Sequence, residues 1–308
     1  MSDPRRWLPF YLPLALIWGC SFLFIKVGLD SFSPVGVAFG RILIGAVTLI
    51  GMCVVMRTRL PPRWSWKYLF IASLLWVSIP WMLFSFAETQ VSSALAGIIN
   101  ALTPLMTLLA ILVAFREEKP TGRRIAGLVL GFGGMLIVVG VWQPLALANA
   151  WAISGLIVAV ACYGIAFPFA RRYLTGPTAR EPIPPVSLAT GLLLWGVIVT
   201  GPIAVATGIG SGPFSAASIA SVAALGILGS GIAYLLNFQV TQRADATTAS
   251  TVTYLTPLVA VIAGAVILGE QLSWNQPVGG VIVVLGAAVA QGLLPRGTPS
   301  PRTRSRRR

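Results

Sequence analysis

LTPL stands at 102–105 and again at 255–258, each time inside a long apolar stretch. A proline inside a helix removes one backbone hydrogen bond and clashes with the preceding turn, at a cost of about 3 kcal/mol. The second copy follows the first by 153 residues, from Pro104 to Pro257, and the same offset matches Ala96 with Ala249, Glu117 with Glu270, Gly127 with Gly280 and Gly133 with Gly286. The chain is therefore predicted to be an internal duplication.

Composition predicts an all-α integral membrane protein. Of the 308 residues, 56% are hydrophobic and 10% are charged, whereas a soluble domain is about 25% charged. Apolar runs of roughly 20 residues, the length that crosses a bilayer as a helix, alternate with short charged loops. A β-barrel would need shorter segments of alternating polarity, which the sequence lacks. We expect ten membrane-spanning helices, at about 8–26, 34–56, 68–86, 92–114, 124–142, 150–169, 185–206, 216–240, 247–268 and 275–294.

The basic residues indicate the orientation of the chain. The formal net charge is +14, which by itself would be compatible with binding nucleic acid. If the N-terminus is cytoplasmic, however, every Lys and Arg except Lys26 and Arg41 falls on the cytoplasmic side. This distribution follows the positive-inside rule, so the charge reflects topology and both ends are expected to be cytoplasmic. The basic segment 295–308 is expected to be a disordered cytoplasmic tail.

The duplication predicts a first five-helix repeat at 1–145 and a second at 146–294. Because five is odd, the second repeat must enter the membrane upside down. The loop charges agree: the basic loop 116–124 of the first repeat corresponds to 269–277, which contains no Lys or Arg. Inverted repeats are typical of secondary transporters.

Motifs at corresponding places in the two halves carry a family resemblance. The first two spans contain Trp18-Gly19, Ser33-Pro34 and Arg41, and the halves end in VSSALAGIINALTPL (91–105) and ADATTASTVTYLTPL (244–258), each followed by a glutamate and a Gly-rich helix. Together they resemble the EamA-type branch of the drug/metabolite transporter superfamily over essentially the whole chain. The resemblance implies ten helices in two inverted repeats, a central cavity, export or exchange of small metabolites or drugs, and a bacterial inner membrane.

Charged residues toward the outer side are candidates for a gate. Arg41 lies inside the second span, where charges are expensive and usually functional. We expect it to tie helices together or to form an outer gate through an ion pair, with Asp30, Glu88 and Glu270 as candidate partners. Substrate contact and snorkelling to the interface are the alternatives. Glu88 either couples proton movement or is an ordinary interfacial acid. The second half has no counterpart of Arg41, since 191–195 reads GLLLW.

Polar and aromatic residues near the two prolines are candidates for a substrate site. Asn100 and its repeat mate Thr253 lie one turn before Pro104 and Pro257, where the helices are expected to break. The full set of cavity candidates is Trp18, Trp76, Trp81, Asn100, Thr103, Tyr163, Tyr234, Thr253 and Tyr254. The alternatives are a packing kink for the prolines, interhelical hydrogen bonds for the polar groups, and an interface belt or core packing for the aromatics.

These features favour a secondary transporter that works by alternating access and exports or exchanges a small metabolite, amino acid or drug-like solute. A channel or facilitator for small solutes remains an alternative. A membrane-embedded enzyme is disfavoured, because the chain has no His and its eight acidic residues are scattered. No metal, cofactor or ATP site is expected, since neither ligand spacing nor a phosphate-binding loop is present. The expected partners are a small-molecule substrate and the lipid bilayer, with no nucleic acid. Glycine pairs 36/40 and 127/131 leave a homodimer open.

Overall fold

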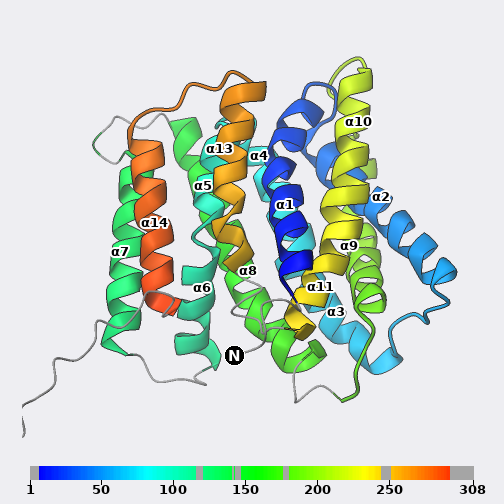
Figure 1. Cartoon of the computed structure of the whole chain (residues 1–308). Helices are drawn as coiled ribbons and strands as arrows, with labels where there is room; N and C mark the ends of the chain where they lie inside the picture. The colour runs from blue at the N-terminus through cyan, green and yellow to red at the C-terminus, as the bar shows by residue number, and fades with distance from the viewer. Residues whose placement is uncertain are drawn as a thin grey trace, which may run out of the picture.

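The computed structural model describes residues 7–115, 121–140, 142, 147–175, 180–243 and 251–291. This described part is helical and contains no strand beyond one isolated bridge between Phe32 and Gly210. The helices pack as one bundle, with α1 in the middle between α13 on one side and α10 and α11 on the other (Figure 1). The predicted all-α class is therefore confirmed.

The helices within the described residues are α1 (Leu8–Gly28), α2 (Pro34–Val55), α3 (Trp66–Ser73), α4 (Ile79–Ala87), α5 (Ser93–Asn100), α6 (Thr103–Ala110), α7 (Gly122–Val139), α8 (Leu147–Ala170), α9 (Pro185–Thr207), α10 (Ala216–Ala224), α11 (Ala233–Arg243), α13 (Thr256–Ile267) and α14 (Asn275–Gln291). Four π-helical segments continue or join them: η3 (Leu74–Ser78), η4 (Ile111–Phe115), η5 (Arg171–Thr175) and η6 (Leu225–Ile232). Two 3-10 turns, η2 (Arg63–Ser65) and η7 (Thr251–Tyr254), complete the described helical elements.

Several of these helices are long and apolar enough to cross a membrane. Seven stretches meet that description in the described part of the chain: Leu8–Gly28, Pro34–Val55, Arg63–Ala87, Ser93–Ala114, Ala150–Thr175, Pro185–Thr207 and Ala216–Val240. Shorter apolar helices lie at Ile125–Val138, Thr256–Ile267 and Asn275–Gly286. The count of ten spans and their inversion stay predictions. The tail at 295–308 lies outside the described residues.

Serine caps fix where several helices begin. The Ser33 hydroxyl accepts a hydrogen bond from the Gly36 N–H at 3.0 Å, and Pro34 occupies the first turn of α2. Ser92 caps α5 in the same way through the Leu95 N–H, at 3.1 Å. A serine oxygen satisfies an amide that has no partner inside the helix, and proline in the first turn lacks an N–H that would be unpaired there anyway.

Both LTPL copies lie at a helix break. α5 ends at Asn100 and α6 begins at Thr103, while the 3-10 turn η7 precedes the start of α13 at Thr256. Pro104 and Pro257 therefore stand in the first turn of a new helix, where the missing N–H costs little. The two threonines make the same bond: each hydroxyl donates to the carbonyl three residues earlier, at 2.8 Å for Thr103 and 3.1 Å for Thr256.

Helices α7 and α14 form a close antiparallel pair (Figure 1). The Asn275 amide, at the start of α14, donates to the Val138 carbonyl near the end of α7 at 3.0 Å. Arg123, at the start of α7, donates to the Val289 carbonyl near the end of α14 at 3.1 Å. The backbones touch at two glycines, since a methyl group added at Gly134 would lie 2.9 Å from the carbonyl oxygen of Gly279. Small residues at such contacts allow helices to approach closely in a membrane.

The connections at the two ends of the bundle also join distant parts of the chain. At one end, the Ser33 N–H donates to the Ile209 carbonyl at 3.0 Å and the Ser211 N–H donates to the Ser31 carbonyl at 2.9 Å. At the other end, the Trp64 indole N–H donates to the Glu181 carboxylate at 2.8 Å. Each end of the bundle is thus tied by bonds between the segment before residue 100 and the segment after residue 180.

Candidate functional site

A cavity lies among α1, α2, η3, α4, α5, α6, α8, α11 and η7. Eight of the nine residues predicted for a substrate site line it: Trp18, Trp76, Trp81, Asn100, Thr103, Tyr163, Tyr234 and Thr253. Tyr254 belongs to η7, but its side chain lies outside the described residues.

Six further residues line the cavity: Ser21, Phe22, Ile25, Arg41, Phe84 and Phe167. Sequence spacing could have found most of them. Ser21, Phe22 and Ile25 follow Trp18 at helical intervals of three, four and seven, and therefore share its face of α1. By the same rule Phe84 lies three residues after Trp81, and Phe167 four residues after Tyr163. Arg41 also lines the cavity, where the alternative of substrate contact would place it.

Residues of the two halves meet at the cavity. Trp81 and Tyr234 are 153 residues apart, the offset of the LTPL copies, and their rings meet edge to face with centroids 5.8 Å apart. The Asn100 amide donates to the Thr256 hydroxyl at 3.4 Å, which joins the two helix breaks directly. The cavity therefore lies where the two halves of the duplication meet.

The π-helical segments fix two of the aromatic walls. Pro80 has no N–H to offer the Trp76 carbonyl of η3, and the Tyr234 hydroxyl donates to that carbonyl at 3.1 Å. In η6 the Gly229 carbonyl, at the position matching Trp76, accepts from the Trp18 indole N–H at 3.3 Å. Backbone oxygens in these two segments thus hold Tyr234 and Trp18 in place at the cavity. π-helical interruptions occur frequently at functional sites.

Arg41 is the charged member of the cavity wall. Its side chain is only 5% exposed. The Nε–H donates to the Ser230 hydroxyl oxygen at 3.2 Å, and the guanidinium carbon lies 3.7 Å from the centre of a Trp81 ring. The Ser230 hydroxyl uses its own proton to bond the Leu225 carbonyl at 3.1 Å, so its oxygen is left to accept from Arg41. Both contacts hold the guanidinium plane in one orientation.

Two stretches of the sequence, 5–140 and 150–291, each match the profile of the EamA-like transporter family. The chain belongs to the EamA-like transporter family. The family domain is thus present twice, and the resemblance inferred from the motifs is confirmed. The chain is accordingly a multi-pass membrane protein of a transporter family.

Relatives within and around this family are similar along most of their length. An uncharacterized transporter of Archaeoglobus fulgidus is 25% identical over 92% of this chain and 97% of its own. Protein PagO of Salmonella typhimurium is 28% identical over 94% and 93%. A probable terminal-alkyne amino-acid exporter of Streptantibioticus cattleyicolor is 25% identical over 87% and 88%. A solved crystal structure shares the fold, with a TM-score of 0.67 over 92% of this chain and 96% of that chain at 18% identity.

The expected ion pair of Arg41 does not form in this EamA-like protein. Among the described residues, no carboxylate oxygen lies within 4.0 Å of its guanidinium. Glu270 is instead occupied at the start of α5, where its carboxylate accepts from the N–H groups of Ser93 at 2.9 Å and Ala94 at 3.1 Å. Asp30 is exposed. A helix N-terminus offers unpaired amides and a positive dipole end, which together compete for a nearby carboxylate.

Glu88 is fully buried immediately after α4, one residue beyond the apolar stretch that ends at Ala87. Neither of its carboxyl oxygens has a hydrogen-bond partner among the described residues. Burial raises the pKa of Glu88 well above its ordinary value, although the charge of Lys26 opposes this. The Lys26 ammonium donates to the backbone carbonyls of Glu88 at 2.7 Å and Val91 at 3.1 Å. Lys26 therefore binds the C-terminal end of α4, a role that sequence reasoning missed.

Metal ligands are not gathered at the cavity. Among the residues that the structure describes, no group of three or more Cys, Asp or Glu side chains is placed to hold a metal ion. The three cysteines, Cys20, Cys53 and Cys162, are free. What the site offers chemically is one fixed cation, a set of aromatic faces, and the amide and hydroxyl groups of Asn100, Thr103 and Thr253.

Proposed function

We propose that the protein is a secondary transporter that moves a small organic solute through this cavity by alternating access. The observation that carries the proposal is the position of the cavity between the two halves, where the ring of Trp81 lies against that of its repeat mate Tyr234 and Asn100 is bonded to Thr256. A site on the axis that relates two inverted halves can be exposed to either side at similar energy.

The proposed architecture has ten spans, in inverted five-helix repeats at 1–145 and 146–294. Three features support this architecture, the first of them the inversion and the other two the repeat. The closing helices of the two halves, α7 and α14, run antiparallel, as the last helices of inverted repeats must. The proline breaks recur at the same offset with the same threonine bond. The π-helical segments η3 and η6 interrupt matching helices.

Alternating access needs contacts that close each end of the cavity in turn. The bonds from Ser31 and Ser33 to the segment 208–215 would close one end, and the bond between Trp64 and Glu181 would close the other. Rocking of one half against the other would break one set while the other remains.

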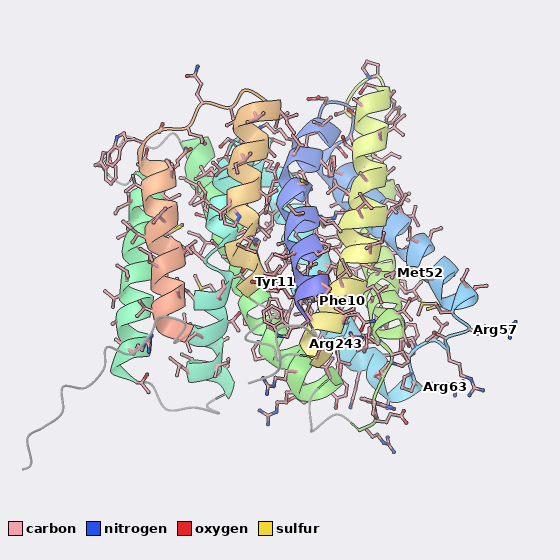
Figure 2. All side chains as sticks on the ribbon, in the orientation of Figure 1. Phe10, Tyr11, Met52, Arg57, Arg63 and Arg243 are labelled. Carbon is pink, nitrogen blue, oxygen red and sulfur yellow. The ribbon has the colours of Figure 1, made fainter. Side chains whose placement is uncertain are left out.

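The proposed location is the bacterial inner membrane, with both termini in the cytoplasm. Figure 2 places Arg57, Arg63 and Arg243 toward the lower end of the bundle. Phe10, near the start of α1, lies at that end too, and the Arg243 guanidinium carbon is 4.5 Å from the centre of its ring. Basic residues gathered at the end where the chain begins support a cytoplasmic face there. The direction proposed is export or exchange, in line with the amino-acid exporter among the relatives.

Reciprocal accessibility tests this proposal without knowledge of the substrate. In a protein lacking its native cysteines, Asn100→Cys reports the cavity to a membrane-impermeant thiol reagent. A lock is added at one end as a disulfide between Phe32→Cys and Gly210→Cys, the bridged pair, or at the other end as a short bis-thiol cross-linker between Trp64→Cys and Glu181→Cys, whose native side chains meet at their tips. We expect each lock to slow labelling from its own side and to speed labelling from the opposite side in oriented vesicles.

The matched control carries only one loop cysteine, so that no lock can form. A channel would give a different pattern: each lock would slow labelling from its own side, while labelling from the opposite side would keep the rate of the control. That result would reject alternating access.

A further inference from the structure

Among the described residues, the Arg41 guanidinium has no charged partner, although its side chain is only 5% exposed. Four of its five N–H groups make no hydrogen bond within the described part of the chain, because only Nε–H is bonded, to Ser230. A buried charge is costly unless it is paired and hydrogen-bonded. The site is therefore built to receive an acceptor that the described residues of the chain do not supply.

The remaining donors are arranged to meet a planar anion. Trp81 covers one face of the guanidinium, with its ring centre 3.7 Å from the guanidinium carbon, and the Ser230 hydroxyl accepts the hydrogen bond from Nε–H. Gly229 leaves room beside Nη2, since a methyl group added there would lie 3.4 Å from it. The terminal nitrogens of arginine present parallel N–H groups that bind a carboxylate through two hydrogen bonds at once.

The charge of the cavity selects for an anion. Arg41 is the one charged residue among the fourteen described residues that line it, and the wall contains no Asp or Glu. A monoanion would balance this charge inside the low-dielectric bundle, whereas a cationic solute would add a second uncompensated charge. Neither of the two nearby glutamates balances the charge of Arg41 in the cavity. Glu270 caps α5, and Glu88 does not line the cavity.

The rest of the wall selects for an apolar body. Eight aromatic side chains line the cavity: Trp18, Phe22, Trp76, Trp81, Phe84, Tyr163, Phe167 and Tyr234. Aromatic rings favour apolar and aromatic partners through burial and edge-to-face contact. Asn100 and Thr253 add an amide and a hydroxyl group to the wall at the helix breaks.

We propose that the cavity binds a small organic carboxylate, with its carboxylate on Arg41 and its apolar or aromatic body against the ring wall. The proposal rests on the proposed transport function for its physiological meaning, but it concerns binding alone. The shared chemistry is the carboxylate, which a simple organic acid and an amino acid both carry.

Binding to the purified full-length protein in detergent tests this assignment, with quenching of tryptophan fluorescence as the signal. The probes share one body and differ in charge: 3-phenylpropionate, 3-phenylpropan-1-ol, 3-phenylpropylamine and L-phenylalanine. We expect wild type to bind 3-phenylpropionate at least about tenfold more tightly than the alcohol, because two charge-assisted hydrogen bonds form with Arg41. The protonated amine is expected to bind most weakly. L-phenylalanine separates the two sources, binding as tightly as the acid if the cavity accepts amino acids and less tightly if it takes simple acids.

Three variants decide the role of Arg41. Arg41→Gln should abolish the preference for acid over alcohol, and Arg41→Lys should keep part of it. Ser230→Ala retains the charge but releases Nε, and should reduce the preference even if Arg41→Gln does not fold. The control Lys26→Gln removes a basic residue that does not line the cavity, and should leave the preference unchanged.

The assignment is overturned if wild type shows no preference for the acid, whether because the alcohol binds equally or because no probe binds. Preference for the amine, or an acid preference that survives Arg41→Gln, overturns it as well. None of these results bears on alternating access, which the accessibility experiment measures without a ligand, so the two proposals fail separately.

Discussion

At the scale of single residues, Glu270 joins the end of α13 to the start of α5. Its carboxylate accepts two backbone N–H groups of α5 and faces the positive end of that helix. Glu270→Ala should lower the free energy of unfolding by about 1–2 kcal/mol, because both amides lose their acceptor. The melting temperature in detergent measures this. Asp30→Ala, which removes an exposed acid, should change it little; equal shifts in the two variants would reject the capping role.

Glu88 should make stability depend on pH. Burial raises the pKa of Glu88 from its ordinary value of 4.5, and Glu270 adds to this, while Lys26 and Arg41 oppose it. Above pH 4.5 the unfolded chain loses a proton that the folded chain keeps, so stability falls as pH rises toward the folded pKa. Glu88→Gln should remove this fall. Melting temperatures of both proteins from pH 4 upward check it, and parallel curves would show that Glu88 is ionised in the folded state.

Residues also mark what could be predicted from the sequence. The 153-residue offset identifies Asn100 and Thr253 as a pair. Helical intervals counted from Trp18 and Trp81 predict most of the other residues that line the cavity. The surroundings of Arg41 could not be predicted, because they depend on Ser230, which approaches from a distant helix. The place of Glu270 could not be predicted for a similar reason: its partner amides belong to the start of α5, which meets the end of α13 only in the folded chain.

At the scale of elements, the contact between α7 and α14 depends on glycine at particular positions. A methyl group at Gly134 would lie 2.7 Å from the Val283 backbone nitrogen, whereas one at the adjacent Gly133 meets nothing within 4 Å. Gly134→Ala should therefore destabilise the protein by about 1–3 kcal/mol, since rigid backbones must separate. Gly133→Ala should be neutral or stabilise it by up to about 1 kcal/mol, because alanine is the better helix former.

Unfolding of these two variants in detergent, at matched expression, checks the contact. A similar loss of stability in both would mean that helix propensity or lipid exposure decides the outcome, and not the contact between α7 and α14.

Helices α7 and α14 also show which elements can be predicted from the sequence. Both helices were expected from their apolar runs, but the π-helical segments η3 and η6 carry no periodicity that separates them from an α-helix.

At the scale of the whole molecule, the two halves share a plan but differ in chemistry. Trp81 has Tyr234 as its mate and Asn100 has Thr253, yet the one cation of the cavity wall comes from the first half alone. A symmetric scaffold allows the two end states to have similar energies, while the asymmetric wall allows one solute to be held in one orientation. In the proposed mechanism, the duplication accounts for movement of the halves, and the differences between them account for selectivity.

Export through this cavity predicts a change in the medium around living cells. Cells expressing wild type should accumulate at least one solute outside that cells expressing Asn100→Ala/Thr253→Ala at equal membrane levels do not, because both polar groups of the helix breaks are lost. Untargeted mass spectrometry of the spent medium measures this, with Gly133→Ala as the control that leaves the cavity intact. Carboxylic acids should dominate the difference if Arg41 selects the solute. Equal export by wild type and the double variant would place the route outside the two helix breaks.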